Sequence, residues 1–552
     1  MKKVVFVLCF VVGLVRAQEI TAKWTPKLSF DSKSLFFKNY IDNNSKYTYA
    51  KYGQVGIGAN KKLKLVAFDK VTFKQVAEVP IKGFPENEAN KKDLNDLDYY
   101  KTIVFENVIY VFWMKENKEK DELYVQTFNA NLKPQNKLKK IYELKTVKGD
   151  KKKAELFIMG NKDVGEKLII GGELSGDKQE KVKIELKVLK SDLSTTNAYQ
   201  IELPLVITGR SDRLSSSYRY GDDGNLYVKF DNMLTIINPE TGEKFVFNSE
   251  YADKKIYDFD FIETKDKIKI FGMFSDLKKN KSGNDIHGIY TVTLENKSFK
   301  VKDNNFTYFS KDQLDKLFSK DQEDRKDKAG IFSSKKKKES EESSLGSSYT
   351  VESAMIEGDD IVFFCSKMFN YSRTTTTTTN GVTSTQTYYY CQKDNVTGFR
   401  VTSDGKIIWA SNVDRRITYS RWNVYDISVV KKGNSFLVIY GSVFKDNVSK
   451  KGCFKMKSNK QLMDEMEYAS FDATSGISSK KTFVVNKKNT PKKERKAVSA
   501  DDISVIDNDF YIASVSNRPR TVVCFIPVLY YCVPFVPSLT VGEGYLGTFT
   551  TK

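Results

Sequence analysis

One order of strand and turn signals recurs along this chain of 552 residues, and it constrains the fold more than any other feature. The unit begins with a short alternating strand and passes a polar turn into an apolar strand. A third strand follows, often ending in an Asp/Asn-x-x-x-Gly turn, and the fourth is more polar. Residues 218–247 form the clearest copy, with GDDGN at 221–225 and NPETG at 238–242 as turns. A chain built this way is predicted to be all-β and repetitive.

Seven further segments follow the same order more or less closely: 47–68, 102–128, 156–189, 257–294, 354–405, 426–476 and 502–513. Four-stranded units at such spacing are typical of blades, which close into a ring that hides the sheet edges. We therefore predict a β-propeller of seven or eight four-stranded blades, since terminal copies often share one blade. Two unrelated β-sandwiches would also show alternation and turns, but they would not repeat the internal order.

The blade turns, such as DDGNLY at 222–227, resemble those of secreted β-propeller proteins of Gram-negative bacteria. The resemblance extends over most of the chain and implies a ring of blades. It implies no particular activity, because blade turns are signals of the fold.

The N-terminus has the pattern of a cleavable secretory signal. Lys2 and Lys3 precede an apolar run over residues 4–15, and Ala17 stands before Gln18. A transmembrane anchor is the alternative, but it needs roughly twenty apolar residues. We expect 1–17 to be removed, 18–552 to form the propeller without a transmembrane segment, and the protein to be secreted, periplasmic or held at the outer surface.

The net charge is +20, and removal of Lys2, Lys3 and Arg16 leaves 87 basic and 70 acidic residues. An excess of +17 favours a polyanionic partner such as an acidic polysaccharide. The alternative is a compositional bias without a ligand, because most lysines alternate with acidic residues on strand faces that are expected to be solvated. Nucleic acid is not an expected partner.

Five cysteines remain after the signal, and an oxidising compartment favours their pairing. Cys365 and Cys391 flank a hairpin-like loop centred in the run Thr374–Thr379, so we expect them to form a disulfide. Cys524 and Cys532 are expected to form a second one, which leaves Cys453 over. Zinc ligand spacings are absent, so no zinc site is expected.

Two insertions interrupt the ring. The first, 310–348, opens with a capping box at 310–313 and a helix carrying Leu314, Leu317 and Phe318 on one stripe, which we expect to end by Gly330. A solvated Lys/Ser-rich tract follows at 335–344. The second is a Thr/Tyr-rich loop extension at 370–391, too long for a turn between strands.

The extension at 370–391 supplies the candidate binding residues, because tyrosines stack on sugar rings and pack at protein interfaces. These residues are Tyr371, Arg373, Tyr388, Tyr389 and Tyr390. A low-complexity loop without a ligand is an equally good interpretation. A second apolar segment, 521–540, contains three prolines that argue against a spanning helix. We expect it to close the last blade, with docking on a membrane protein as the alternative.

Catalytic signals are weak. His287 is the single histidine and is expected to be structural. A glycan-cleaving carboxylate pair would need no histidine, and its candidates at strand ends are Asp258, Asp260, Asp426 and Asp502. Oxygen ligands gather at Asp93, Asn95, Asp96 and Asp98, where Ca²⁺ is a weak expectation and a plain acidic turn the stronger one. No other cofactor is expected.

These features together favour an exported, non-catalytic binding or scaffolding propeller. Its expected partner is an envelope protein or an extracellular glycan. The alternative is a carboxylate-based enzyme that acts on an extracellular glycan, and a polyanion-binding protein is a third interpretation.

Overall fold

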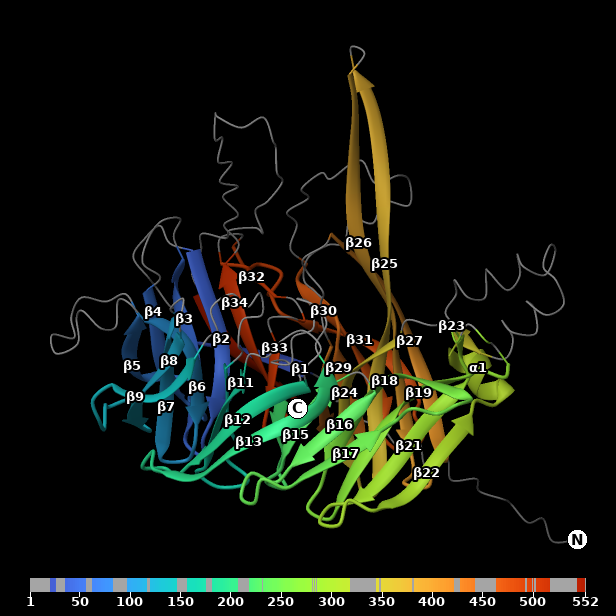
Figure 1. Ribbon diagram of the computed structural model, residues 1–552. Helices are drawn as coiled ribbons and strands as arrows, with labels where there is room; N and C mark the ends of the chain where they lie inside the picture. The colour runs from blue at the N-terminus through green and yellow to red at the C-terminus, as the bar shows by residue number, and fades with distance from the viewer. Residues whose placement is uncertain are drawn as a thin grey trace, which may run out of the picture.

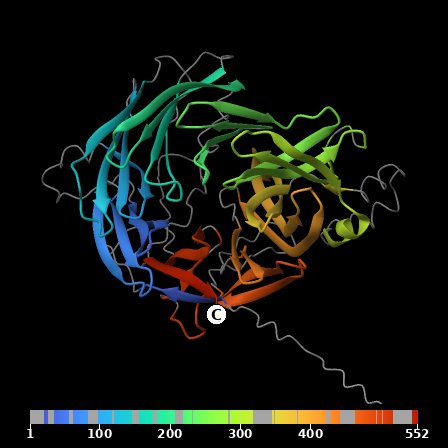
Figure 2. The same cartoon turned by 90° about the horizontal axis from the view of Figure 1, so that it is seen from below.

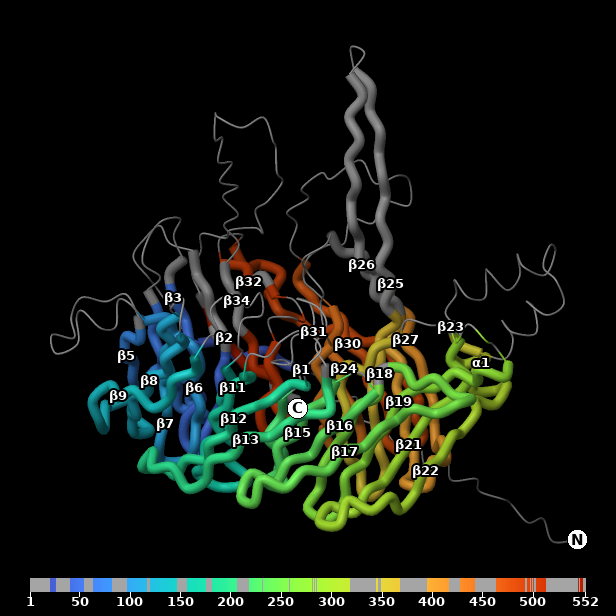
Figure 3. The backbone as a smooth tube through the Cα atoms, in the orientation of Figure 1, coloured from blue at the N-terminus to red at the C-terminus, as the bar shows by residue number. Residues whose placement is uncertain are grey.

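Antiparallel four-stranded sheets recur along the chain and stand side by side around one axis (Figures 1 and 2). The computed structural model describes residues 20–25, 35–55, 62–82, 97–116, 120–145, 156–174, 181–206, 218–230, 232–279, 281, 283, 285–317, 344–346, 349–379, 382–420, 427–441, 463–491, 494–498, 500, 503–516 and 544–551. The sheets are the eight blades of a β-propeller, so the predicted fold class is confirmed. Figure 3 follows the chain around the ring from blade 1 to blade 8.

Each of the first seven blades uses four strands in chain order, with the first strand innermost. Blades 1 to 3 contain β2 (Leu35–Asn43), β3 (Tyr47–Val55), β4 (Lys62–Asp69) and β5 (Gln75–Lys82); β6 (Asp98–Val104), β7 (Val108–Glu116), β8 (Lys120–Asn129) and β9 (Lys139–Lys145); β10 (Leu156–Gly160), β11 (Leu168–Leu174), β12 (Lys181–Leu189) and β13 (Thr195–Val206). Blade 4, β14 (Tyr218–Tyr220), β15 (Leu226–Phe230), β16 (Met233–Ile237) and β17 (Lys244–Asn248), coincides with the clearest sequence copy.

The remaining regular blades carry the insertions. Blade 5 contains β18 (Lys254–Glu263), β19 (Lys267–Asp276), β21 (Gly288–Glu295) and β22 (Val301–Tyr308). Blade 6 contains β24 (Tyr349–Glu357), β25 (Asp360–Thr379), β26 (Val382–Val401) and β27 (Ile407–Ser420). Blade 7 contains β28 (Ser428–Lys432), β29 (Ser435–Ile439), β30 (Glu465–Asp472) and β31 (Ser478–Val484). A small pair, β20 (Asp285–Ile286) with β23 (Leu345–Gly346), lies beside blade 5.

Both ends of the described chain meet in blade 8. The strand β34 (Asp509–Ser516) pairs on one side with β32 (Lys496–Ala497) and β33 (Ile503–Ile506), and on the other with β35 (Gly544–Thr551). The first strand of the chain, β1 (Ile20–Trp24), then pairs with β35 as the outermost strand. This pairing closes the ring and removes the open edges that separate terminal blades would have.

The core lies between blades. Second strands are buried on both faces, as in β19, where every residue after Lys267 is buried. Aromatic rings cross the boundary from one blade to the next. Phe364 of blade 6, for example, packs edge-on against Phe436 and Phe471 of blade 7, with ring centroids 5.8 Å and 5.2 Å apart. Continuous apolar strands are therefore required in every blade, which is the pattern that the sequence repeats.

A residue with positive φ recurs in the turn between the third and fourth strands. Seven blades have one: Phe73, Leu132, Leu193, Gly242, Phe299, Gly405 and Gly476. In each blade its amide donates a hydrogen bond back to the carbonyl at the end of the third strand, at 2.8–3.0 Å. The side chain, or the space that a glycine leaves, faces the preceding blade. The turn therefore serves as a contact between neighbouring blades.

The described part of the helical insertion contains one short helix. The helix α1 covers Lys311–Leu317, and its predicted capping box is present: Gln313 N–H donates to Ser310 Oγ at 3.2 Å, and Ser310 N–H donates to Gln313 Oε1 at 2.9 Å. Leu314 and Leu317 are buried against blades 5 and 6. Phe318, Gly330 and the tract at 335–344 lie outside the described residues.

The Thr/Tyr-rich extension at 370–391 is predicted as a loop, but in the structure it is part of a β-hairpin. β25 and β26 are each 20 residues long and pair continuously to the rung Thr379–Val382, so the hairpin extends well beyond the ring (Figure 1). Threonine is β-branched and favours extended backbone, and the sequence between the two strands, Asn-Gly at 380–381, is a dipeptide suited to a two-residue turn.

The predicted Cys365–Cys391 disulfide does not fit this register. Cys365 lies opposite Thr397, whereas Cys391 lies opposite Asn370. Five residues of extended strand span roughly 16 Å, far beyond the Cα separation that a disulfide allows. The expectation assumed a turn centred in the threonine run, whereas β25 and β26 pair as far as the rung Thr379–Val382, at the end of that run. The predicted pair Cys524 and Cys532, with Cys453, lies outside the described residues.

Candidate functional site

One end of the ring carries a belt of polar contacts. They are made by the inner turns, which join the first and second strands of each blade, by the adjoining strand residues, and by Lys70 from the turn between the third and fourth strands of blade 1. These contacts link neighbouring blades: Ser45–Glu106 (blades 1 and 2), Asn161–Asp222 (3 and 4), Arg219–Glu263 (4 and 5), Lys267–Asp359 (5 and 6), Lys431–Glu357 (6 and 7), Lys432–Asp509 (7 and 8) and Lys70–Asp507 (8 and 1). Five of these contacts are ion pairs, so the charges in them are compensated from a neighbouring blade.

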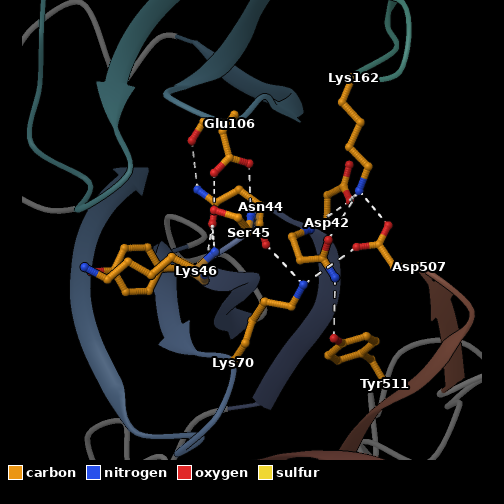
Figure 4. Close-up of polar contacts among 11 residues, drawn as sticks. Asp42, Asn44, Ser45, Lys46, Lys70, Glu106, Lys162, Asp507 and Tyr511 are labelled. Atoms are coloured by element: carbon orange, nitrogen blue, oxygen red, sulfur yellow. Dashed lines mark hydrogen bonds and ion pairs between the residues drawn. The ribbon is translucent and has the colours of Figure 1, made fainter.

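Lys162 makes a contact of a different kind, because it reaches across the ring (Figure 4). It belongs to the inner turn of blade 3, yet its Nζ lies 2.8 Å from Asp507 Oδ1 of blade 8. The same Nζ lies 3.4 Å from Asp42 Oδ1 and 3.3 Å from Asn43 Oδ1 of blade 1. Three oxygens at the seam between blades 8 and 1 thus surround the ammonium group of Lys162. This group comes from blade 3, which is separated from the seam by blade 2. We call Asp42, Asn43, Lys162 and Asp507 the axial cluster.

The local backbone explains why Asp507 is presented to this cluster. Ile506 and Asp509 form the last rung between β33 and β34, so the turn contains only Asp507 and Asn508. Both have positive φ, at 49° and 59°, which is the conformation of a tight two-residue hairpin turn. Asp and Asn tolerate this conformation better than most residues. On the other side of the turn, the Asn508 side chain exchanges two hydrogen bonds with the backbone of Lys431 in blade 7.

A bulge and a side-chain hydrogen bond shape the blade 1 side of the cluster. The register between β2 and β3 shifts between Tyr40 and Asp42, and the strands then pair for two more rungs, at Asp42 and Asn43. Asn43 Nδ2 donates to Tyr511 Oη of blade 8 at 3.4 Å. Lys70 approaches the other oxygen of Asp507, at 3.7 Å from Oδ2. The seam is therefore held by uncharged as well as ionic contacts.

The two carboxyl groups of the axial cluster differ electrostatically. Burial raises the pKa of Asp42 above its usual value, in spite of the ammonium of Lys162. Burial also acts on Asp507, but the hydrogen bond and charge of Lys162 outweigh it and lower the pKa of Asp507. Burial disfavours the charged form of Lys162, yet its carboxylate partners raise its pKa overall. A pair of carboxyl groups with pKa values pushed apart is also the arrangement that acid–base catalysis uses.

The candidate binding residues lie on the hairpin, and the register pairs four of them. Tyr371 lies opposite Tyr390, and Arg373 lies opposite Tyr388. Directly opposed residues and residues two positions apart share a face of the ladder, so these four lie on one face. Tyr389, opposite Ser372, falls on the other face. The backbone register thus brings these four residues onto one face of the hairpin. The structure describes their backbone but not their side chains.

The other residues singled out by sequence do not form a site in the described chain. Asp260 lies on β18 with Lys229 Nζ 3.7 Å away. Asp258 lies on the same strand, but its side chain is not described, and Asp426 and Asp502 lie outside the described residues. The same holds for Asp93, Asn95 and Asp96, whereas Asp98 starts β6. Among the described residues no three acidic, cysteine or histidine side chains gather as metal ligands would.

His287 is structural, as its isolation in the sequence indicates. It is 2% exposed, and its Nδ1 accepts a hydrogen bond from the backbone N–H of Asp276 at 3.2 Å. Burial lowers the pKa of His287, so its imidazole is neutral and serves as an acceptor inside blade 5.

The axial cluster was missed by sequence reasoning. Lys162 and Asp507 stand 345 positions apart, and each reads as an ordinary polar turn residue. A usable signal was their common place in the repeat, because all inner turns lie at one end of a propeller. Which of those turns would meet across the axis depends on the number and tilt of the blades.

The chain matches no protein-family model and no curated protein. Among solved structures it is similar to a prolyl endopeptidase (9% identity, TM-score 0.36, covering 89% of this chain and 55% of that one) and to the WD40 domain of SCAP from fission yeast (7%, 0.34, 96% and 94%). It is also similar to the β-propeller domain of the Trilobed protease from Pyrococcus furiosus (11%, 0.30, 71% and 96%).

The chain spans just over half the length of the prolyl endopeptidase. No helix in the described residues has the length and apolar character needed to cross a membrane. At these identities the similarities concern the fold alone, and the fold is the eight-bladed β-propeller described above.

Proposed function

We propose that this protein is an exported, non-catalytic binding or scaffolding propeller for protein–protein or glycan recognition at the cell envelope. The observation that carries the proposal is the β25–β26 hairpin. It extends blade 6 past the ring and aligns Tyr371, Arg373, Tyr388 and Tyr390 on one face. Aromatic rings beside a guanidinium are suited to sugar rings and to protein interfaces.

The described charges support a binding role over a catalytic one. Carboxylates at this end of the ring, such as Asp359 and Glu357, contact basic groups of neighbouring blades, and the axial cluster places an ammonium between its two carboxyl groups. Groups engaged in this way stabilise the ring. They are not free to exchange protons with a substrate unless Lys162 moves away.

The test is a binding panel with the mature chain 18–552. Immobilised lipopolysaccharide, peptidoglycan, a neutral glucan, heparin and a solubilised envelope fraction serve as probes. The variant Y371A/Y390A removes one opposed pair, and we expect it to weaken binding to the recognised probe by at least about tenfold. The variant Y389A is the control, because it removes a tyrosine from the other face of the same hairpin.

The outcomes separate the candidate partners. Binding that is indifferent to Y371A/Y390A, or no binding to any probe, would overturn the proposal. Retention on heparin alone, unaffected by the tyrosine variant and lost as salt rises, would instead support the polyanion interpretation.

A second candidate is a carboxylate-based enzyme acting on an extracellular glycan. It is favoured by the opposite pKa shifts of Asp42 and Asp507, which would suit a general acid and a base or nucleophile. The discriminating assay follows release of reducing ends from the same polysaccharides. Hydrolysis by the native chain that falls at least about a hundredfold in both D42N and D507N would support this candidate. Absence of hydrolysis would exclude it for those substrates.

A further inference from the structure

The outer part of the β25–β26 hairpin has two strand edges without a described neighbour. On the β25 side, pairing with β24 ends at Lys367, so among the described strands residues 368–379 pair only with β26. On the β26 side, pairing with β27 ends at Tyr390, so within the described part of the chain residues 382–389 pair only with β25. An edge of this kind presents a row of backbone N–H and C=O groups that another strand can pair with.

The sequence of this hairpin has few of the features that normally block strand addition. Residues 371–390 contain one charged residue, Arg373, in a chain of which 29% is charged. They contain no proline and no lysine, the residues that natural edge strands commonly use as protection. Six consecutive threonines, Thr374–Thr379, give the edge of β25 a high preference for extended backbone.

We propose that two copies of this chain associate through the free edge of β25, antiparallel and about a two-fold axis within Thr374–Thr379. The choice of β25 follows from its free edge, which is longer than that of β26. A two-fold axis places the same residues opposite themselves in reverse order, so threonine faces threonine across the interface. Such cross-strand pairs are favourable, and the isologous contact closes at a dimer.

The low charge and self-complementary sequence of the hairpin are the arguments for a second copy as the occupant. The chain carries a formal net charge of +20, so two copies repel one another over most of their surface. The hairpin is almost uncharged and extends away from the ring, which lets the two charged rings remain apart while the edges pair (Figure 1). A uniform run of threonines can pair with a second, antiparallel copy of itself at any register. Pairing with a strand of another protein would not require this property.

This inference goes beyond the proposed function and is tested by a different measurement. Ligand binding by the tyrosine face and self-association by the β25 edge are read out separately, so that either can fail alone.

The experiment measures molar mass by sedimentation equilibrium from nanomolar to high micromolar concentration. We expect the native mature chain to double its mass as concentration rises. The variant T376K/T378K places two like charges on the paired edge and is expected to remain monomeric. The control S479K/T482K adds the same charge at exposed positions of β31 and is expected to dimerise as the native chain does.

A second variant keeps the test valid if the lysines disturb the hairpin. Residues 374–387 are replaced by Asn-Gly, so that the opposed pair Arg373–Tyr388 flanks a two-residue turn in the native register. This variant is expected to be a folded monomer. In the native chain, hydrogen exchange of backbone amides within 368–379 should slow as concentration rises.

Two results would overturn the proposal. One is a native chain that is monomeric at every concentration, which would also be the result if the edge accepts only a strand of another protein. The other is a dimer that persists in both T376K/T378K and the shortened hairpin, because its interface would then lie elsewhere.

Discussion

The turn between the third and fourth strands of a blade requires a residue with positive φ, and two kinds of residue meet this requirement. Phe73 is buried against Tyr511 of the preceding blade, with ring centroids 6.5 Å apart. Gly476 occupies the same place in blade 7, where Trp409 of blade 6 takes the space that a side chain would fill. A large apolar residue and a glycine are therefore alternative solutions to the same contact between blades.

Substitution of Gly476 should separate the cost of the backbone from the cost of packing. A Cβ at Gly476 would lie 2.6 Å from the Trp409 indole, whereas a Cβ at Gly358, with a similar φ of 62°, would meet nothing within 4 Å. We expect G358A to lower the free energy of unfolding by about 1 kcal/mol, for the left-handed backbone alone. G476A should lower it by a further ~1–3 kcal/mol through overpacking. Urea unfolding of the two variants measures the difference, and equal losses would contradict it.

Glu122 should make stability depend on acid pH. Its side chain is 9% exposed, and Lys120 Nζ lies 2.8 Å from one of its oxygens. Hydrogen bonds from Lys120 and then Lys140 outweigh the effect of burial and lower the pKa of Glu122 to about 2. A carboxyl group with a depressed folded-state pKa stabilises the fold above its unfolded pKa of 4.5 and loses that contribution as pH falls toward 2.

The variant E122Q tests this linkage. We expect it to be less stable than the native chain at pH 7, and the gap between the two should narrow steadily below about pH 4.5. Urea unfolding at a series of pH values measures the gap, with E465Q at an exposed position as the control. A gap that is constant with pH would show that Glu122 acts through packing and not through its charge.

At the scale of elements, the β25–β26 hairpin shows how a turn sets every contact along two strands. The register that ends at the rung Thr379–Val382 has Cys391 opposite Asn370, and a register shift between Ser366 and Lys367 brings Cys365 opposite Thr397. A turn centred in the threonine run would have brought the two cysteines together. Because register propagates along a ladder, an error of a few residues at the tip becomes an error of several rungs at the base.

Peptide mapping without reduction checks this register. We expect no cross-linked peptide joining Cys365 to Cys391 in the mature, oxidised protein. As a second measurement, C391S should leave the thermal unfolding midpoint unchanged, whereas removal of a native disulfide typically costs 2–5 kcal/mol. A Cys365–Cys391 cross-link would require a register in which the hairpin turns several residues earlier.

At the scale of the whole molecule, the ring is closed in two ways. The first is β1, whose buried Ile20 packs in the core shared by blades 7 and 8. The second is Lys162, which joins blade 3 to the seam between blades 8 and 1. The first closure is apolar and hydrogen-bonded along a whole strand, whereas the second depends on charges that are partly exposed to solvent.

A double-mutant cycle of K162M and D507N measures the contact across the ring. The side chains are 33% and 44% exposed, so we expect a coupling energy in the range of solvent-exposed pairs, about 0.5–1 kcal/mol. It should decline in concentrated salt, because partly exposed charges are screened. The cycle K181M with E202Q, a pair within blade 3, is the control that spans no blade boundary. A coupling energy of zero for Lys162 and Asp507 would show that the two blades meet there without an energetic link.

The repeat predicted most of the fold because each blade is specified locally. Apolar alternation, turn dipeptides and their order are readable within one copy, and blade 4 was located almost to the residue. The candidate site was predicted only in part. The tyrosines of 370–391 stood out by composition, but the axial cluster did not, since nothing near Lys162 in the sequence refers to Asp42 or Asp507.

The sequence by itself determined that this chain is a repetitive all-β protein, because strand periodicity and turn chemistry depend on neighbours within a few residues. Only the tertiary structure decided that there are eight blades and that the first strand of the described chain completes the last of them. It also decided which inner turns meet at the axis and which rungs the hairpin forms. These outcomes depend on how many blades fit around a ring and on where one turn falls, and both are set by packing between residues hundreds of positions apart.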